Sequence, residues 1–420
     1  MIGVGDFRAT DRTRSLVAEV LDSGRLSYGP MTQRLEEKWA AIHEVKHAIA
    51  VTSGTAALDA ALRAARSLYG WNDGDEVIIP AVTFVATANA CLLNNLIPVP
   101  VDVRPETGNI NPECIAQAIT DRTVAILPVH LFGQPAEMMK ITAIARAFGL
   151  FVLEDSCETF AAGAPDSLGR VVPVGGWGGA AAFSTYVAHH VPAGIGGFVT
   201  TNDSYMNDAV RSIVNHGRNL AYWNADMAVA DPSLQFRFGL VGHNYRTHEL
   251  VSAVALAEIE GDAWLANVMR RREIAHIYSD AFQRLDNVFD ITRTFEIAES
   301  WAWSDKALRH SWMMFPVFYK PADARPALKF ELMAWLRDAG VDTRETLPLT
   351  NQPVYARLAA GVDIPAWISA RQKRVTEIYR EAAYPVAAWM NRTGFYLPCH
   401  HLMSADDVAH VIRKVREYVV

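Results

Sequence analysis

The sequence has few cysteines and no long apolar run. Its 420 residues contain four cysteines, Cys91, Cys114, Cys157 and Cys399. Their wide spacing fits neither a disulfide framework nor a zinc or iron–sulfur ligand set, so we expect four reduced, buried thiols and no metal. No stretch approaches the ~20 apolar residues that cross a bilayer, and residues 1–10 lack the basic and apolar parts of a signal peptide. We therefore expect a cytoplasmic protein without a membrane partner.

Positive charge is neither abundant nor clustered. The net charge is -7 at pH 7, and the longest basic run is Arg270-Arg271-Arg272. A nucleic-acid partner is therefore not expected, and we interpret the triplet as a solvated helix face. Lysine is especially scarce: only eight of the 39 basic residues are lysines, and none lies between Lys140 and Lys306.

Short apolar segments alternate with helical patterns over the first 260 residues, and half of all residues are apolar. Helices are predicted at 56–67 and 138–148. Buried strands of a largely parallel sheet are predicted at 76–80, 97–103, 125–129, 151–155, 180–184 and 198–201. Ligands of such sheets bind beyond the carboxyl ends of the strands, where Asp155, Ser184 and His189 lie.

A long helical pattern at 249–282 predicts the link between two domains. We expect residues 1–260 to form a large α/β domain and residues 261–420 a smaller α+β domain. In the second, the pattern predicts a strand at 310–320 and a final helix at 405–418 capped by Ser404.

A cluster of small polar residues opens the helix that follows residues 48–51. Thr52-Ser53-Gly54-Thr55 places backbone N–H groups and hydroxyls at the positive end of a helix, which suits a phosphate. An ordinary Ser/Thr cap explains the same residues, and taken alone they favour the cap.

Asp155 and Phe84 also have two explanations each. Asp155 ends an apolar strand beside Glu154, and a buried carboxylate needs a cation or hydrogen-bond donors. The protonated pyridine nitrogen of a pyridoxal cofactor would be such a partner, whereas a structural ion pair is the simpler account of the residue alone. Phe84 is either a core residue or a ring that stacks on a cofactor.

Taken in order, these motifs resemble the DegT/DnrJ/EryC/StrS family of sugar aminotransferases, which are fold-type I pyridoxal phosphate (PLP) enzymes. The matching segments are Gly24 to Pro30, Ser53 to Leu58, Gly74 to Pro80, Glu154-Asp155, Phe183-Ser184, Gly194 to Gly197 and Gly242 to Arg246. The series covers most of the chain.

The resemblance implies a role for each matching residue. The cofactor phosphate would be held by Gly54, Thr55 and Ser184. Asp155 would pair with the pyridine nitrogen, and Phe84 would stack on the ring. Asn244 would reach the phosphate of the neighbouring subunit, because the family builds each site across a homodimer.

The Schiff-base lysine of these aminotransferases is missing here. In the family it follows the Phe-Ser strand and precedes a Gly-x-Gly-Gly turn, and His189 stands at that position. An imidazole can move a proton near neutral pH but cannot hold PLP covalently. The resemblance therefore implies His189 as the catalytic base, a non-covalently bound cofactor, and an orienting or packing role for His190, although a His-His pair is generally more often structural.

The segment Ala188-His189-His190 is similar to one branch, the 3-dehydratases that act on nucleotide-linked 4-keto-6-deoxyhexoses, such as GDP-4-keto-6-deoxymannose, with pyridoxamine phosphate (PMP). His310-Ser311-Trp312 and Thr343-Arg344 are similar to this branch, and Tyr186 and Glu158 match positions that line its active site. The implied reaction removes the 3-hydroxyl, and glutamate regenerates PMP. One member type of this branch carries an iron–sulfur cluster on clustered cysteines, and another has none. Because no cysteine lies between Cys157 and Cys399, the resemblance favours the type without the cluster.

Three departures leave the substrate open. Val187 stands where the branch usually has Pro, Ile195 where it has Glu, and Glu158 where it has Asp. One alternative is another PLP or PMP reaction on the same scaffold, such as amino transfer or elimination from a different keto substrate. Another is a silent relative that only binds, although it would have no need of a complete cofactor site. Arg218 and Arg344 could grip a diphosphate or a carboxylate, or form surface ion pairs.

Overall fold

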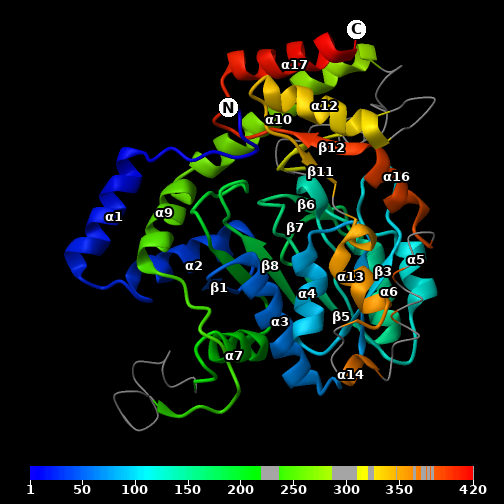
Figure 1. Ribbon diagram of the computed structural model, residues 1–420. Helices are drawn as coiled ribbons and strands as arrows, with labels where there is room; N and C mark the ends of the chain where they lie inside the picture. The colour runs from blue at the N-terminus through cyan, green and yellow to red at the C-terminus, as the bar shows by residue number, and fades with distance from the viewer. Residues whose placement is uncertain are drawn as a thin grey trace.

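The protein is an α/β structure built on a seven-stranded mixed sheet (Figure 1). The computed structural model describes residues 1–218, 236–285, 310–319, 326–346, 348–362, 366–369, 375, 379 and 383–419. The strands, in sheet order, are β1 (His47–Val51), β9 (Gly197–Thr201), β8 (Ala180–Ser184), β5 (Phe151–Asp155), β4 (Thr123–Ile126), β2 (Glu76–Pro80) and β3 (Ile97–Val101). Pairing is parallel from β8 to β3, and β9 is antiparallel to both of its neighbours. The predicted α/β class with a mostly parallel sheet is confirmed.

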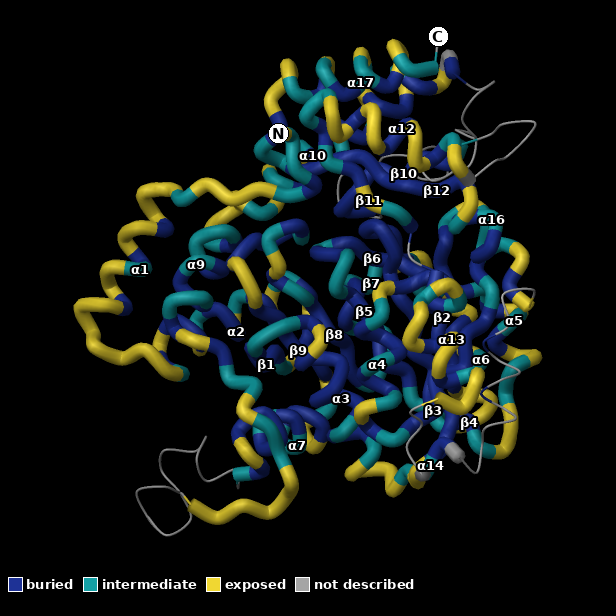
Figure 2. Tube along the Cα trace, in the orientation of Figure 1, coloured by how far each residue is buried: buried dark blue, intermediate teal, exposed yellow. Residues whose placement is uncertain are grey.

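Helices pack around this sheet and bury its strands (Figure 2). They are α1 (Asp11–Ser23), α2 (Pro30–Ile42), α3 (Gly54–Tyr69), α4 (Val85–Leu93), α5 (Pro112–Ala118), α6 (Met138–Phe148), α7 (Ser204–Ile213) and α9 (Glu249–Ile259). Helix α3 lies against β8 and β9. Its alanines Ala57, Ala60, Ala61 and Ala64 are fully buried, and such small side chains let the helix approach the strands closely. This packing fixes the start of α3 beside the end of β8.

A second, smaller sheet is antiparallel, with the order β10 (Phe315–Phe318), β12 (Gly394–Leu397), β11 (Arg344–Glu345). The helices near it are α10 (Ala263–Phe282), α12 (Pro326–Asp338), α16 (Pro385–Thr393) and α17 (Ala405–Val419). Tyr278, Leu336, Phe395 and Val411 belong to the separate core beneath this sheet.

Short elements complete the description. They are η1 (Leu131–Gly133), β6 (Gly163–Pro165), β7 (Val171–Pro173), η4 (Gln283–Leu285), η5 (Leu349–Asn351), α13 (Pro353–Ala359) and α14 (Ala366–Ser369). Tyr355 of α13 packs into the core of the large sheet although it follows the second sheet's first strand in sequence. The domain boundary near residue 260 stays a prediction.

Two predicted elements differ from those observed. The helix expected at 249–282 is two helices, because the chain leaves the α conformation at Glu260 and Gly261 has a left-handed φ of 60°. The strand expected at 310–320 is shorter and begins at Phe315, since Trp312 has a φ of 52°, which no strand residue adopts. Lys320 lies outside the described residues. The Ser404 cap is confirmed, because its Oγ accepts a hydrogen bond from the Asp407 N–H at 3.1 Å.

Two interpretations of single side chains were wrong. Arg271 is not on a solvated face, because only 1% of it is exposed. All four cysteines are free, but Cys114 and Cys157 are only partly buried. No helix among the described residues is long and apolar enough to span a bilayer, and the cytoplasmic location stays a prediction.

Candidate active site

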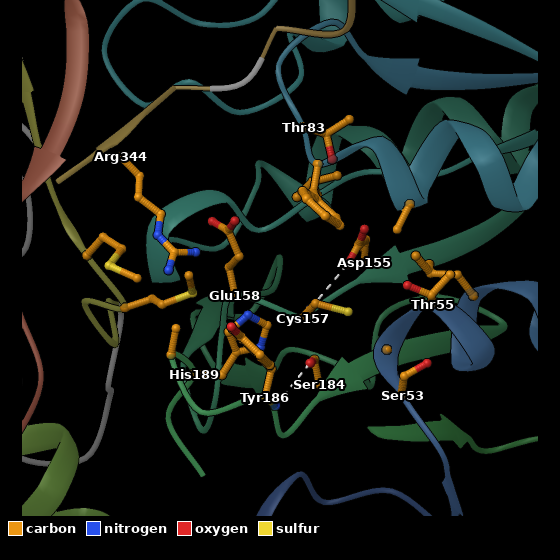
Figure 3. A pocket seen from close by; sticks show the side chains of 18 of the residues that line it. Ser53, Thr55, Thr83, Asp155, Cys157, Glu158, Ser184, Tyr186, His189 and Arg344 are labelled. Atoms are coloured by element: carbon orange, nitrogen blue, oxygen red, sulfur yellow. Dashed lines mark hydrogen bonds between the residues drawn. The ribbon is translucent and has the colours of Figure 1, made fainter. Parts of the chain in front are cut away.

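A cavity of about 430 Å³ opens between the carboxyl ends of the large-sheet strands and the second sheet (Figure 3). Eight of the nine predicted site residues line it: Gly54, Thr55, Phe84, Asp155, Glu158, Ser184, Tyr186 and His189. The ninth, Asn244, is exposed and does not line this cavity. Its Oδ1 accepts a hydrogen bond from Arg246 Nε at 3.0 Å. Its predicted role toward a neighbouring subunit stays a prediction.

The start of α3 forms a cradle for an anion. Ser53 is the N-cap, and its Oγ accepts the Ala56 N–H at 3.1 Å. The N–H groups of Gly54 and Thr55 precede the first intrahelical hydrogen bond, so they remain available to a ligand at the positive helix end. A Cβ at Gly54 would lie 2.7 Å from Cys157 Sγ and 2.9 Å from Ser184 Cβ. Glycine is therefore required where the helix start approaches the end of β8, and this geometry fits a phosphate.

Gly54→Val is expected to weaken cofactor binding by about 10- to 100-fold, because the side chain would displace two walls of the cradle and cost one or two charge-assisted hydrogen bonds. Titration of the cofactor's absorbance measures this. The matched control is Gly70→Ala at the other end of α3, where no atom lies within 4 Å of a built Cβ but φ is 66°. That change should lower stability by about 1 kcal/mol and leave cofactor affinity unaltered. Equal affinity in Gly54→Val and wild type would contradict the cradle.

Asp155 is a buried carboxylate at the floor of the cavity, with 5% of its surface exposed. Its Oδ2 accepts a hydrogen bond from Thr87 Oγ1 at 2.8 Å, and its Oδ1 accepts the Cys157 N–H at 3.2 Å. Burial raises its pKa. No residue in the described part of the chain forms an ion pair with it, so the structural ion-pair explanation has no support there. Its environment fits a protonated pyridine nitrogen.

Glu154, which precedes Asp155 in β5, is held by hydrogen bonds away from the cavity. Its Oε2 lies 3.1 Å from His130 Nε2, and backbone N–H groups of Gly175, Trp177 and Gly178 donate to its two oxygens at 2.9 Å. Glu154 is fully buried and holds the segment that leads into β8. It is therefore structural, and only Asp155 faces the cavity.

Two aromatic rings border the cavity. Phe84, the N-cap residue of α4, is 55% exposed, so it is not a core residue and is open to a ligand. The Tyr186 ring meets the His189 ring edge-on, with centroids 5.9 Å apart. Both aromatic residues line the cavity, and their roles beside a cofactor stay predictions.

Glu158 lies on the cavity wall beside a strained turn. Its Oε2 accepts the N–H of Phe132 at 2.8 Å, and Phe132 has a left-handed φ of 58°. Burial raises the pKa of Glu158 from 4.5 to about 7, against the opposing effect of the Phe132 N–H. Figure 3 shows Glu158 and Arg344 both pointing into the cavity.

The raised pKa of Glu158 predicts a pH-dependent stability. Because the folded state binds the proton more tightly than the unfolded chain, this contribution is full below pH 4.5 and lost as the pH rises through about 7. Wild-type protein should therefore lose melting temperature between pH 5 and 8 relative to Glu158→Gln, whose amide does not titrate. Thermal scans of the ligand-free proteins measure the difference. Parallel curves for the two proteins would show that Glu158 ionises normally.

His189 lies in the loop after β8, where its backbone N–H donates to the Tyr186 carbonyl at 2.8 Å. Burial lowers its pKa to about 4, and the charges of Arg271 and Arg344 act in the same direction against a backbone contact from Ser184. The imidazole is therefore neutral at pH 7, which is the form that accepts a proton. Its Nδ1 is buried and has no hydrogen-bond partner among the described residues.

His190 points elsewhere. Its Nε2 lies 3.1 Å from the Ser311 carbonyl oxygen, it is 5% exposed, and its ring stacks near Phe160. It does not line the cavity. Its contacts are those of a packing residue.

None of the described residues that line the cavity is a lysine. The described lysine with the most buried side chain, Lys329, is engaged elsewhere, since its Nζ donates to Glu345 Oε2 and to the Asn391 carbonyl, both at 2.7 Å. Lys306, Lys320 and Lys373 lie outside the described residues. Within the described ranges, no group of His, Cys, Asp and Glu side chains could hold a metal ion.

Several cavity residues were not predicted. They include Thr83, Met313, Met314, Glu345 and Tyr396. Arg344 lines the cavity, whereas Arg218 does not, and its guanidinium lies 5.0 Å from the Phe236 ring centre. Of the two arginines considered for substrate binding, only Arg344 is in this cavity.

Comparison with known proteins identifies the family. The model of the DegT/DnrJ/EryC1/StrS aminotransferase family matches residues 8–416. The chain belongs to this family. It is therefore an enzyme of the PLP- and PMP-dependent, sugar-modifying type, as the resemblance in the sequence implied.

Two curated proteins illustrate the similarity. The spore coat polysaccharide biosynthesis protein SpsC of Bacillus subtilis is 33% identical over 406 residues, with 96% of this chain and 93% of the relative covered. The GDP-perosamine synthase of Caulobacter vibrioides is 32% identical over 361 residues, with 85% and 88% covered.

Solved structures agree with the fold. DesV of S. venezuelae, solved in complex with a ketimine intermediate, is 28% identical with a TM-score of 0.74, and 97% of this chain and 94% of that chain are covered. The ntda protein of Bacillus subtilis, solved with bound PMP, has a TM-score of 0.75 at 23% identity, with 97% and 81% covered.

Proposed function

We propose that the protein is a PMP-dependent 3-dehydratase of a nucleotide-linked 4-keto-6-deoxyhexose. The observation that carries the proposal is His189, neutral and facing a cavity whose described lining residues include no lysine. A family enzyme without the tethering amine binds its cofactor non-covalently. An imidazole can transfer protons, as the lysine does, but it cannot form the covalent bond that the lysine makes to the cofactor.

The residues that would hold the cofactor fit it on their own geometry. Gly54, Thr55 and Ser184 would bind the phosphate, Asp155 the pyridine nitrogen, and Phe84 one face of the ring. When bound, PMP supplies an amine that condenses with the substrate ketone and a ring that accepts electrons from the bonds beside it. Asn244, exposed outside its own chain's cavity, would complete the phosphate site of the second subunit in a homodimer.

The chain's own side chains would move the protons. Neutral His189 accepts a proton and later returns one. Glu158, which has a pKa of about 7, can supply the proton with which the 3-hydroxyl leaves as water. The cavity's apolar wall, which includes Met313 and Met314, limits water near these groups.

The overall reaction balances without an external reductant. The keto-sugar and glutamate would give the 3-deoxy-4-keto sugar, 2-oxoglutarate and ammonia. Glutamate supplies the two electrons that the lost hydroxyl requires. Accordingly, neither a metal cluster nor a reductase partner enters the proposal.

Amino transfer to the same class of sugar is the second candidate. The family relatives favour it, since one is named a GDP-perosamine synthase. Ile195, 66% exposed at the cavity, also departs from the dehydratase pattern. In that reaction the cofactor's nitrogen would remain in the sugar product.

One experiment separates the two candidates. Purified protein is incubated with PLP, glutamate and a panel of GDP-, CDP- and TDP-linked 4-keto-6-deoxyhexoses, and products are analysed by mass spectrometry. We expect a product 16 mass units lighter than the substrate, together with one equivalent of ammonia. An amino-sugar without free ammonia would establish amino transfer instead.

A further inference from the structure

Arg271 of α10 is a buried cation directly behind the His189 loop. Only 1% of the residue is exposed. Its Nη1 donates to the backbone carbonyls of Met313 at 3.0 Å and Cys399 at 2.9 Å, with Trp312 at 3.5 Å. Its Nη2 donates to the carbonyl of His189 itself at 3.1 Å. One side chain thus joins three segments that are distant in sequence.

No carboxylate in the described ranges forms an ion pair with Arg271. Burial lowers its pKa to about 10, which still leaves it charged at pH 7. A buried charge without a counter-ion is costly, and here only backbone carbonyl dipoles compensate it. A neutral residue could fill the same space without the free-energy cost of burying a charge. The contribution of Arg271 is therefore its hydrogen bonds to these carbonyls.

The ring of His189 has a backbone contact from Ser184 and meets the edge of the Tyr186 ring, but one of its two nitrogens is unsupported by the described residues. The buried Nδ1 has no partner among the described residues, so no hydrogen bond on that nitrogen fixes the ring. The N-terminal segment also packs closely on this loop, since a Cβ at Gly5 would lie 2.3 Å from the Ala188 Cα. The loop is therefore contacted by both Gly5 and Arg271.

We propose that Arg271 is a positioning residue that fixes the backbone of His189 at the wall of the cavity. This inference rests on the proposed role of His189 as the base. A base misplaced by about 1 Å can cost 100-fold in rate. The same guanidinium also bonds the backbone of Met313, which lines the cavity. Arg271 therefore fixes the position of His189 relative to the cavity wall at Met313.

Arg271 also affects the charge state of the base. Charges that face His189 come from Arg271 on α10 and Arg344 on β11, and both lower its pKa after burial. Its other near neighbours are His190, which also has a lowered pKa, and the edge of the Tyr186 ring. Removing the Arg271 charge should therefore raise the pKa of His189.

The test compares Arg271→Met, Arg271→Lys and Arg270→Met in the full-length, cofactor-loaded enzyme. Arg270 is the matched control on the same helix, where it bonds Glu273 and the Met403 carbonyl. Both Arg271 variants should lose about 10- to 100-fold in kcat with KM within about threefold. In Arg271→Met the acid limb of kcat/KM should move to higher pH. In Arg271→Lys, which keeps the charge, the limb should stay in place. Arg270→Met should match wild type.

Amide hydrogen exchange of residues 186–191 in the cofactor-free protein gives a readout that is independent of the reaction. Faster exchange there in both Arg271 variants, and not in Arg270→Met, is expected. Wild-type kcat, or wild-type protection of this segment, in Arg271→Lys would overturn the inference. If Arg271→Met does not fold, kcat and amide exchange of Arg271→Lys decide whether the inference holds. If the product is an amino-sugar, the proposed function fails, but the exchange result still tests the positioning role.

Discussion

His189→Asn is expected to lower kcat by about 10²- to 10⁴-fold, because the amide occupies similar space but cannot take up a proton. Cofactor affinity should change little, since other residues are proposed to make the phosphate, pyridine and ring contacts. In D₂O the wild-type product should carry solvent deuterium at the deoxygenated carbon. Steady-state kinetics with glutamate and mass analysis of the product measure both effects.

His190→Gln is the matched control for that substitution. His190 lies outside the cavity lining and bonds the Ser311 carbonyl, so its loss should lower the melting temperature while kcat stays within about threefold of wild type. If His190→Gln abolished turnover in a folded protein and His189→Asn did not, the roles assigned to the two imidazoles would have to be exchanged.

Asp155→Asn should separate activity from stability. A neutral amide cannot stabilise the protonated pyridine nitrogen, so we expect kcat to fall by about 100-fold or more. The ligand-free protein should keep or gain melting temperature, because an amide avoids the cost of burying an unpaired carboxylate. Cofactor titration, kinetics and thermal scans of the same preparation give the cofactor affinity, kcat and melting temperature.

Glu154→Gln is expected to give the opposite pattern. Its carboxylate bonds His130 and three backbone N–H groups, and an amide nitrogen would face one of these donors. Leaving one of these buried donors without an acceptor costs about 1–3 kcal/mol. A stability loss in Asp155→Asn equal to that in Glu154→Gln would mean that Asp155 is structural as well.

Local patterns predicted the strands of the large sheet and the start of α3. The apolar run at β5, bounded by turn residues, gave that strand with its observed bounds Phe151–Asp155. Ser53 followed by Gly54 gave the start of α3 and its cap. These features depend on residues within a few positions of each other, so a single sequence carries them. The family resemblance then ordered them into one site.

The burial of Arg271 could not be predicted from the neighbouring sequence. Three consecutive arginines on a helix suggest a solvated face, and Arg270 does form a surface ion pair with Glu273. Arg271, one residue further around α10, is covered because Cys399, 128 positions away, comes to lie beside it. Nothing near Arg271 in the sequence shows which face of the helix is covered. The burial of a charge is a tertiary property.

The second wall of the cavity could not be predicted for a similar reason. Met313, Met314 and Tyr396 belong to two segments that meet the large sheet only after the chain has folded back. The N–H that Phe132 presents to Glu158 depends on a left-handed backbone conformation that its own residue type does not indicate. The sequence named Glu158, and the structure explains its raised pKa.

Borohydride treatment of the PLP-loaded protein, followed by peptide mass spectrometry, tests the central claim most directly. The account predicts that the cofactor is removed by dialysis and that no peptide carries a pyridoxyl group, because an imidazole is proposed to stand where the amine would be. His189→Lys under the same treatment should carry the label on the introduced lysine, which shows that the assay detects a link at this position. A pyridoxyl group on any lysine of the wild-type chain would contradict the account.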